Sequence, residues 1–211
     1  QVGYGLTLTY SAEDTSGITW TYLQQPVDNE ADTIKPFGEG YFRQLPVTVP
    51  QANVTYDAYL SGEFLWTASW AGGLRRYHLT KKVWENVPLP MDDQDLLSLC
   101  DRRGFDTTAT DSRPILKDYY LNPRDPGDGG NHNHKAFSII VFGDTIWVGT
   151  ANGINKGILI KEIAEIQGVF EILDCIEWEH YSFPDDGLSG NFVVGLAKQF
   201  WNGQITIWAA S

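Results

Sequence analysis

The segment from Asp125 to His134 carries the side chains of this chain that are best suited to bind a metal. It holds two carboxylates, Asp125 and Asp128, and two imidazoles, His132 and His134, within its ten residues. Oxygen ligands favour calcium, whereas two imidazoles favour a transition metal. In an extended strand His132 and His134 would point to the same side. The segment does not match the calcium-hand pattern, so we expect no cofactor, and calcium is the alternative.

The same segment also has the composition of a turn-rich loop. Pro and Gly surround Asp125, and Asn and Asp side chains often hydrogen-bond to their own backbone in turns. In that case His132 and His134 donate to loop carbonyls and tie the segment to the strand that follows. We favour this structural role, and a metal site is the alternative.

Other chemistry is sparse. The chain has no Gly-x-Ser-x-Gly elbow and no phosphate-binding glycine loop. Arg75 lies beside Arg76, and adjacent residues of a strand point to opposite faces, so the pair is a poor clamp for an anion. Trp70, beside Gly72-Gly73, is a candidate for sugar binding, with core packing as the alternative. The speculative ligand-binding residues are Trp70, Arg75 and Arg124.

An internal repeat predicts the elements that position these residues. Each copy joins two strand-like runs by a tight turn, and the second run carries a Trp; the copies span 56–69, 138–150 and 193–211. Two copies continue through a Gly-rich turn into a third strand, and a fourth follows at 83–87 and 176–181. Four antiparallel strands per repeat are typical of a β-propeller blade. The alternative is an ordinary β-sandwich with chance similarity between its hairpins.

Two stretches of the repeat resemble a known group. Asp186–Ala197 and Ile146–Asn155 resemble the two-component-regulator propeller repeat. Ser11–Trp20 resembles an Asp box of sialidase type, with one extra residue between its Asp and its Gly. The resemblance implies a β-propeller of a large secreted or cell-surface bacterial protein. It is specific for the fold and not for an activity, because such repeats serve many functions.

The resemblance also implies an alternative function. Asp-box sialidases clamp a carboxylate with several arginines and use a Tyr nucleophile with an acidic partner. The chain would then be part of a glycan hydrolase or lyase whose active site needs other blades. We expect instead a non-catalytic scaffold for ligand, glycan or protein binding.

The predicted fold class is all-β, as an arc of a β-propeller in a single partial domain over residues 1–211. We expect the end of a blade at about 1–24, a blade at 54–90, an insertion at 91–134, a blade with an insertion at 135–182 and the start of a blade at 188–211. A ring needs roughly four to eight blades. We therefore expect the rest of a longer polypeptide, or other chains, to complete the ring.

The chain has two cysteines, Cys100 and Cys175, which lie in insertions of adjacent blades. An even pair in an apparently secreted chain favours a disulfide. The bond would close a loop of about 75 residues and stabilise the fold by roughly 3 to 5 kcal/mol on the chain-entropy model. Two unrelated buried thiols are the alternative.

Charge excludes some partners. The chain has 15 basic and 27 acidic residues and a net charge of −12, which repels nucleic acid and anionic membranes. It has no apolar run of about 18 residues, so we expect no membrane insertion. Together with the resemblance, this composition predicts a protein that is secreted or at the cell surface.

Overall fold

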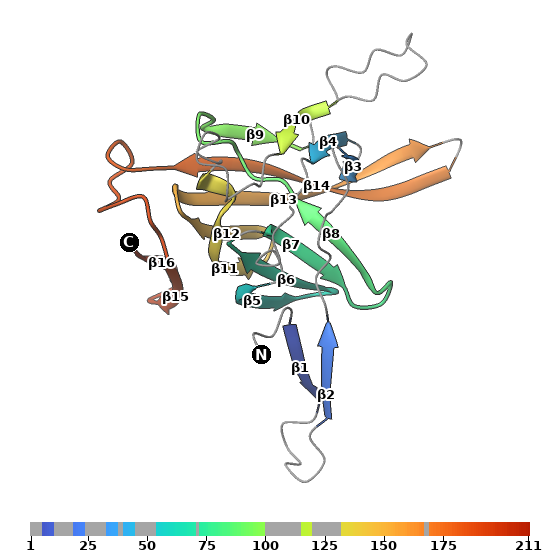
Figure 1. Ribbon diagram of the computed structural model, residues 1–211, viewed down its shortest axis with the longest axis horizontal. Helices are drawn as coiled ribbons and strands as arrows, with labels where there is room; N and C mark the ends of the chain where they lie inside the picture. The colour runs from blue at the N-terminus through green and yellow to red at the C-terminus, as the bar shows by residue number, and fades with distance from the viewer. Residues whose placement is uncertain are drawn as a thin grey trace.

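The structure, a computed structural model, describes residues 6–10, 19–23, 33–37, 40–44, 54–70, 72–99, 115–119, 132–166 and 169–211. Strands dominate these residues, and all strand pairs except one are antiparallel (Figure 1). The predicted all-β class is therefore confirmed. No helix in this part of the chain is long and apolar enough to span a membrane.

The first large sheet contains four strands in chain order. They are β5 (Thr55–Ser61), β6 (Phe64–Ser69), β7 (Gly73–His78) and β8 (Val83–Val87). Gly62 lies in the turn between β5 and β6, and Gly73 is the first residue of β7. Their φ angles are 57° and 65°, which glycine adopts without steric cost. The central strands β6 and β7 are almost wholly buried.

The second large sheet repeats this order and adds a fifth strand. It contains β11 (Ala136–Phe142), β12 (Thr145–Thr150), β13 (Gly153–Ile166), β14 (Val169–Tyr181) and β9 (Leu96–Ser98), with β9 at the edge beside β14. A short 3-10 turn, η3 (His132–His134), leads into β11. The first strands of the two sheets, β5 and β11, lie next to each other.

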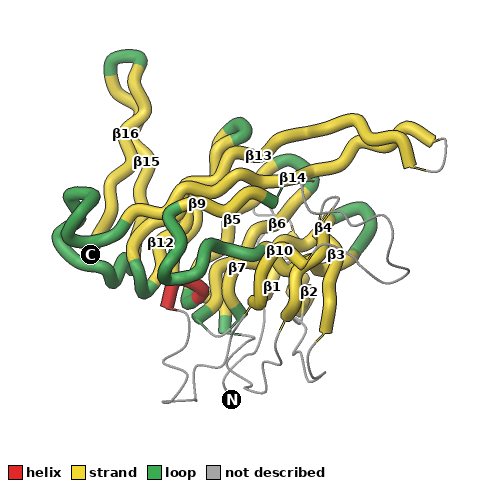
Figure 2. Tube along the Cα trace, turned by 90° about the horizontal axis from the view of Figure 1, so that it is seen from above, coloured by secondary structure: helices red, strands yellow, loops and turns green. Residues whose placement is uncertain are grey.

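Three smaller sheets complete the described structure. Two are hairpins, β1 (Leu6–Tyr10) with β2 (Thr19–Leu23), and β15 (Gly195–Trp201) with β16 (Gln204–Ala210). The third has the order β10-β4-β3, from β3 (Thr33–Phe37), β4 (Gly40–Gln44) and β10 (Ile115–Tyr119), and β10 is parallel to β4. Figure 2 shows that β15–β16 projects from the body of the molecule as a separate hairpin.

The two large sheets have the same register across all four strands. In the first sheet Trp66 pairs with Arg76, which pairs with Glu85. In the second, Trp147 pairs with Lys156, which pairs with Glu179. Both basic residues bind their acidic partners, Arg76 Nε to Glu85 Oε2 at 2.6 Å and Lys156 Nζ to Glu179 Oε2 at 2.9 Å. The repeat predicted from the sequence therefore extends to corresponding side-chain pairs.

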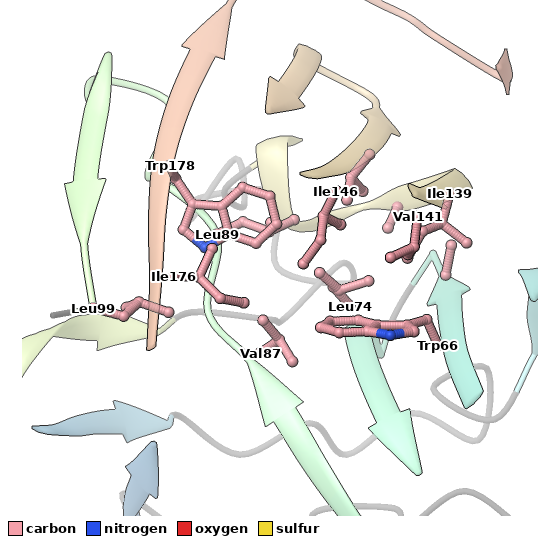
Figure 3. Close-up of a cluster of buried hydrophobic side chains, with 13 residues drawn as sticks. Trp66, Leu74, Val87, Leu89, Leu99, Ile139, Val141, Ile146, Ile176 and Trp178 are labelled. Atoms are coloured by element: carbon pink, nitrogen blue, oxygen red, sulfur yellow. The ribbon is translucent and has the colours of Figure 1, made fainter. Parts of the chain in front are cut away.

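The hydrophobic core fills the space between these sheets (Figure 3). One face of the first sheet contributes Trp66, Leu74 and Val87, and the facing side of the second contributes residues such as Ile146 and Trp178. Sheet faces that pack like this exclude water from large apolar side chains, which is the main stabilising term in folding.

The repeat predicts equivalent buried positions for Trp66 and Trp147, and this prediction is wrong, since the two are not equally buried. Trp66 is 2 % exposed because the second sheet covers its face. Trp147 is partly exposed and lies on the opposite face of the second sheet, away from this core. Its neighbours beyond that face include the two-stranded β15–β16 hairpin, which contacts β11 and β12. A smaller covering sheet leaves Trp147 more accessible.

The insertion expected within the blade at 135–182 covered residues 157–174. In the structure most of these residues extend two strands, since β13 runs to Ile166 and β14 begins at Val169. These strands pair without interruption from Ile154↔Tyr181 to Ile166↔Val169. The sequence here is rich in Ile and lacks Pro, which suits continuous strand pairing. The segment thus forms a long hairpin arm (Figure 1).

Candidate functional site

Two of the residues predicted to bind ligand lie in described structure, and both contribute to packing. Trp70 is half-buried and packs against the core between the sheets. Arg75 is fully buried, and its Nε donates to Asn86 Oδ1 at 2.8 Å. Arg76 binds Glu85, the residue beside Asn86 on β8, as expected for side chains on opposite faces. Arg124 lies outside the described residues.

Two of the four candidate metal residues, His132 and His134, lie in the described structure. Asp125 and Asp128 lie outside the described residues, so the four-residue metal site stays a prediction. His134 is fully buried, and its Nε2 lies 2.6 Å from the carbonyl oxygen of Leu89. This contact with a loop carbonyl agrees with the structural role favoured from the sequence. Within the described part of the chain, no three His, Cys, Asp or Glu side chains are grouped to hold a metal.

His132 is exposed and lies next to a carboxylate. Asp92 accepts hydrogen bonds from the backbone N–H groups of His132 and Asn133, at 3.0 and 2.7 Å. The His132 Nδ1 lies 3.3 Å from the same carboxylate. Asp92 thus fixes the 3-10 turn η3 from a loop 40 residues earlier in the chain. The two histidines do not point to one side of a strand, because this segment forms a turn.

Cys175 is buried in β14, and the described residues contain no free cysteine. Cys100 lies outside the described residues, so its disulfide with Cys175 stays a prediction. The neighbouring backbone supports it, since Leu99 N donates to Ile176 O at 2.9 Å.

A buried polar network lies where η3 meets the second sheet. Asn133 is fully buried, and its Nδ2 donates to Asn155 Oδ1 at 2.8 Å and to Pro90 O at 2.9 Å. Its Oδ1 accepts from Asn155 Nδ2 and from Thr150 Oγ1, both at 2.8 Å. His180 Nδ1 lies 2.9 Å from Asn133 Nδ2. The network joins four segments that are distant in sequence.

An open pocket of about 390 Å³ lies beside this network, at the end of β14. Most of its lining side chains are acidic or carry a hydroxyl group. The lining residues are Asp95, Leu96, Glu179, His180, Tyr181, Ser182, Asp185 and Asp186. The volume is within the range of small-ligand sites, and the four carboxylates disfavour an anionic ligand.

Tyr181 and Glu179 are joined by a short hydrogen bond in the pocket. The Tyr181 hydroxyl donates to Glu179 Oε2 at 2.5 Å, and Lys156 Nζ donates to the same oxygen at 2.9 Å. Both donors lower the pKa of the Glu179 carboxyl. The hydrogen bond to Glu179, followed by burial, raises the pKa of Tyr181 to about 12. Tyr181 is therefore a protonated donor near neutral pH. Its ring stacks on Trp147 at 6.4 Å between centroids, with an interplanar angle of 23°.

His180 connects the pocket to the buried network. Its backbone N–H donates to Asp95 O at 2.7 Å, which holds the loop before β9 at the pocket wall. Burial lowers the pKa of the His180 imidazole, against the opposing effect of Asp95, Asp92 and Asp186. Asn133 Nδ2 is only a donor, so the neutral His180 ring faces it with an unprotonated Nδ1 that shares its two N–H groups with Asn155 and Pro90.

Sequence reasoning did not identify Glu179, His180 or Tyr181 as site residues. They belong to a run that was assigned only as a fourth strand. Residues two positions apart in a strand lie on the same face of the sheet, so the sequence could have predicted that Glu179 and Tyr181 share one. Nothing in the sequence shows that Asp95, distant along the chain, lies beside them. No protein-family model, curated protein or solved structure matches this chain.

Proposed function

We propose that this chain is an arc of a β-propeller in a secreted or surface-attached bacterial protein, and that it is a non-catalytic scaffold that binds a glycan in the pocket at the end of β14. The pairing of Tyr181 with Glu179 carries the proposal. At this open pocket the Tyr181 ring offers apolar contact area to a sugar, and the hydroxyl and the carboxylate beside it offer hydrogen-bonding groups.

The propeller arc is supported by the common register of the two large sheets. Trp66, Arg76 and Glu85 correspond to Trp147, Lys156 and Glu179. The first strands β5, β11 and β15 follow one another, and β11 contacts both of the others. This arrangement is typical of blades around a common axis.

Charge narrows the class of glycan. The pocket is lined by Asp95, Glu179, Asp185 and Asp186, and no arginine is among its lining residues. Sugars that carry amines, or neutral sugars that donate hydroxyl groups, are suited to this lining, whereas acidic sugars are repelled. The ligand class we propose is therefore a neutral or amino-sugar oligosaccharide.

The rival function is a part of a glycan hydrolase of Asp-box type. The contact of Tyr181 with Glu179 favours it, since such enzymes pair a Tyr nucleophile with an acid. Because the pKa of Tyr181 is raised to about 12, Glu179 would have to act as the general base that takes the phenol proton during attack. Among the described residues that line the pocket, no arginine is present to clamp an acidic sugar.

Three oligosaccharides of different charge test the proposal. A glucosamine trimer, an N-acetylglucosamine trimer and sialyllactose are titrated into isotopically labelled protein, and amide shifts around Tyr181 are measured by NMR. We expect shifts with one or both of the first two sugars. Tyr181→Phe should weaken that binding about tenfold, because the sugar loses one hydrogen bond to the Tyr181 oxygen. Tyr56→Phe, exposed on β5 and outside the pocket, is the matched control and should bind unchanged.

Two results would contradict the proposal. Binding or hydrolysis of sialyllactose, lost in Tyr181→Phe, would favour the hydrolase. Absence of any shift near Tyr181 with all three sugars would remove the glycan assignment and leave only the architectural part of the proposal.

A further inference from the structure

One wall of the pocket is the end of the segment at residues 90–96, called here the wall segment. At its start, the carbonyl oxygen of Pro90 accepts a hydrogen bond from Asn133 Nδ2 at 2.9 Å. Near its end, the carbonyl oxygen of Asp95 accepts the backbone N–H of His180 at 2.7 Å. The side chains of Asn133 and His180 contact each other, so this contact connects the two attachments of the wall segment.

The contact between Asn133 and His180 requires an unprotonated ring nitrogen. Asn133 Nδ2 lies 2.9 Å from His180 Nδ1, and an amide nitrogen can only donate. A proton on Nδ1 would place two donors against each other. Both side chains are buried, and a buried donor without an acceptor is unfavourable. Protonation of this nitrogen therefore breaks the contact.

The Asn133 amide is held in its orientation by its other hydrogen bonds. Its Oδ1 accepts from Asn155 Nδ2 and from Thr150 Oγ1, both at 2.8 Å. Its Nδ2 donates to Asn155 Oδ1 and to Pro90 O. Turning the amide over would direct its oxygen at the Pro90 carbonyl, which has no proton to donate. Relief of the clash therefore requires Asn133 or His180 to move, and each of them holds one end of the wall segment.

Three carboxylates act on the His180 imidazole from two loops. Asp92 and Asp95 belong to the wall segment, and Asp186 belongs to the loop after β14. Their negative charges favour a protonated ring, but burial has the larger effect and lowers the pKa of His180 below its usual 6.5. The ring is therefore neutral near pH 7 and takes up a proton only in mild acid.

The other elements beside His180 present neutral groups to it. On β13 it is opposite Asn155, and on η3 it contacts Asn133. The two histidines of η3 have other partners, a loop carbonyl and an aspartate. On β14 the neighbouring Glu179 points to the opposite face of the sheet.

We infer that the contact between His180 and Asn133 couples the protonation of His180 to the position of the wall segment, so that the pocket binds its ligand when His180 is neutral and releases it in mild acid. The ligand part of this inference rests on the glycan site proposed above. The coupling itself rests on the hydrogen bonds and is tested without a ligand.

Hydrogen exchange of wild-type protein at pH 7.5 and pH 5 tests the coupling. The backbone N–H of His180 reports its bond to Asp95, and the intrinsic pH dependence of exchange is divided out. Its protection should fall at least about tenfold at pH 5, with the midpoint at which the His180 ring titrates by NMR. The N–H of Leu99, which bonds to Ile176 O on the same strand β14, is the internal control and should keep its protection. A fall of both together would mean global unfolding and would overturn the inference, as would a His180 ring that stays neutral at pH 5.

Two variants separate His180 from other histidines. His180→Gln cannot titrate, and its side-chain oxygen can still accept from Asn133, so protection at position 180 should be the same at both pH values. His78→Gln is the matched control, since His78 is also buried but lies on β7, outside the pocket, and it should keep the wild-type response. A response that persists in folded His180→Gln would overturn the inference. If that variant does not fold, the comparison of His180 with Leu99 in the wild type decides.

An N-acetylglucosamine trimer tests the ligand part, because it has no group that titrates in this range. Wild-type protein should bind it at least about fivefold more weakly at pH 5 than at pH 7.5, and His180→Gln should bind it equally at both. The bound trimer should also lower the pKa of His180 further, since the coupling is reciprocal. Equal wild-type affinity at both pH values would overturn the inference. Absence of binding at both, with the exchange response intact, would reject this trimer as the ligand and leave the coupling of His180 to the wall segment supported.

Discussion

Asn133 and Asn155 exchange side-chain hydrogen bonds, with the Nδ2 of each donating to the Oδ1 of the other at 2.8 Å. Both residues are fully buried. Asn133 precedes β11, and Asn155 lies in β13, so the pair joins the entry of the second large sheet to its third strand. The same amide of Asn133 reaches His180, whose backbone forms part of the pocket wall.

Asn133→Ala should destabilise the fold by about 2 to 4 kcal/mol. The substitution leaves buried partners, among them Asn155 and Thr150, without their hydrogen bonds, and each unsatisfied group costs about 1 to 3 kcal/mol. Urea unfolding measures the change. Gln199→Ala is the control, because its one described side-chain bond, from Trp208 Nε1, is at the surface, and its effect should stay within about 0.5 kcal/mol. A similar cost for both variants would show that the network contributes little.

Acid should destabilise the protein partly through His180. Burial lowers the pKa of His180 in the folded state below its usual 6.5, so the unfolded state binds the proton more readily. The contribution of neutral His180 is complete above about pH 6.5 and is lost as the pH falls towards the folded-state pKa. Urea unfolding of the wild type and of His180→Gln at pH 7.5 and pH 5 measures this loss. The wild type should lose more stability than the variant, and equal losses would contradict the assignment.

Gly149→Ala should destabilise the contact between the second large sheet and the β15–β16 unit by about 1 to 3 kcal/mol. A Cβ at Gly149 would lie 2.5 Å from Ser138 Oγ and 2.9 Å from Val193, which lies two residues before β15. At Gly190 a Cβ would meet nothing within 4 Å, so Gly190→Ala is the matched control and should be neutral. Thermal unfolding compares the two. Equal melting temperatures would mean that the two units are not closely packed.

Glu179→Gln should lower the pKa of Tyr181 from about 12 towards its usual value of 10.0, because it weakens the acceptor and removes a negative charge. Ultraviolet titration of tyrosinate measures the shift. Glu177→Gln is the control, since Glu177 is exposed two positions earlier on the same strand, and it should leave the Tyr181 titration unchanged. If both variants titrate like the wild type, Glu179 does not hold the proton on Tyr181.

Cys100 and Cys175 should form a disulfide. Leu99, the residue before Cys100 in the sequence, donates its backbone N–H to the carbonyl oxygen of Ile176, the residue after Cys175. Mass spectrometry after alkylation without reductant should find no modified thiol in the folded protein. Alkylation of both cysteines under these conditions would contradict the bond. Removal of the bond should cost roughly 2 to 5 kcal/mol of stability.

Local sequence patterns predicted the hairpins well. Gly62 and Gly143 sit in the expected turns with φ near 57° and 56°, because only such residues permit tight turns of this kind at no steric cost. The pattern of Ile and Trp also predicted the strands around Trp147. The extension of β13 and β14 was not predicted. Residues 157–174 were expected to be an insertion, whereas most of them continue these two strands.

The sequence by itself determined that this protein is built from strands and tight turns, because turn glycines and alternating apolar residues act over a few neighbouring positions. It also determined the repeat, which the registers of Trp66 and Trp147 confirm. The tertiary structure alone decided which side chains meet at the pocket. Asp95 and His180 are far apart along the chain, and only the pairing of β9 with β14 brings them together. The tertiary structure also decided how far each tryptophan side chain is buried. Its exposure depends on the sheet that covers it and not on its neighbours in the sequence.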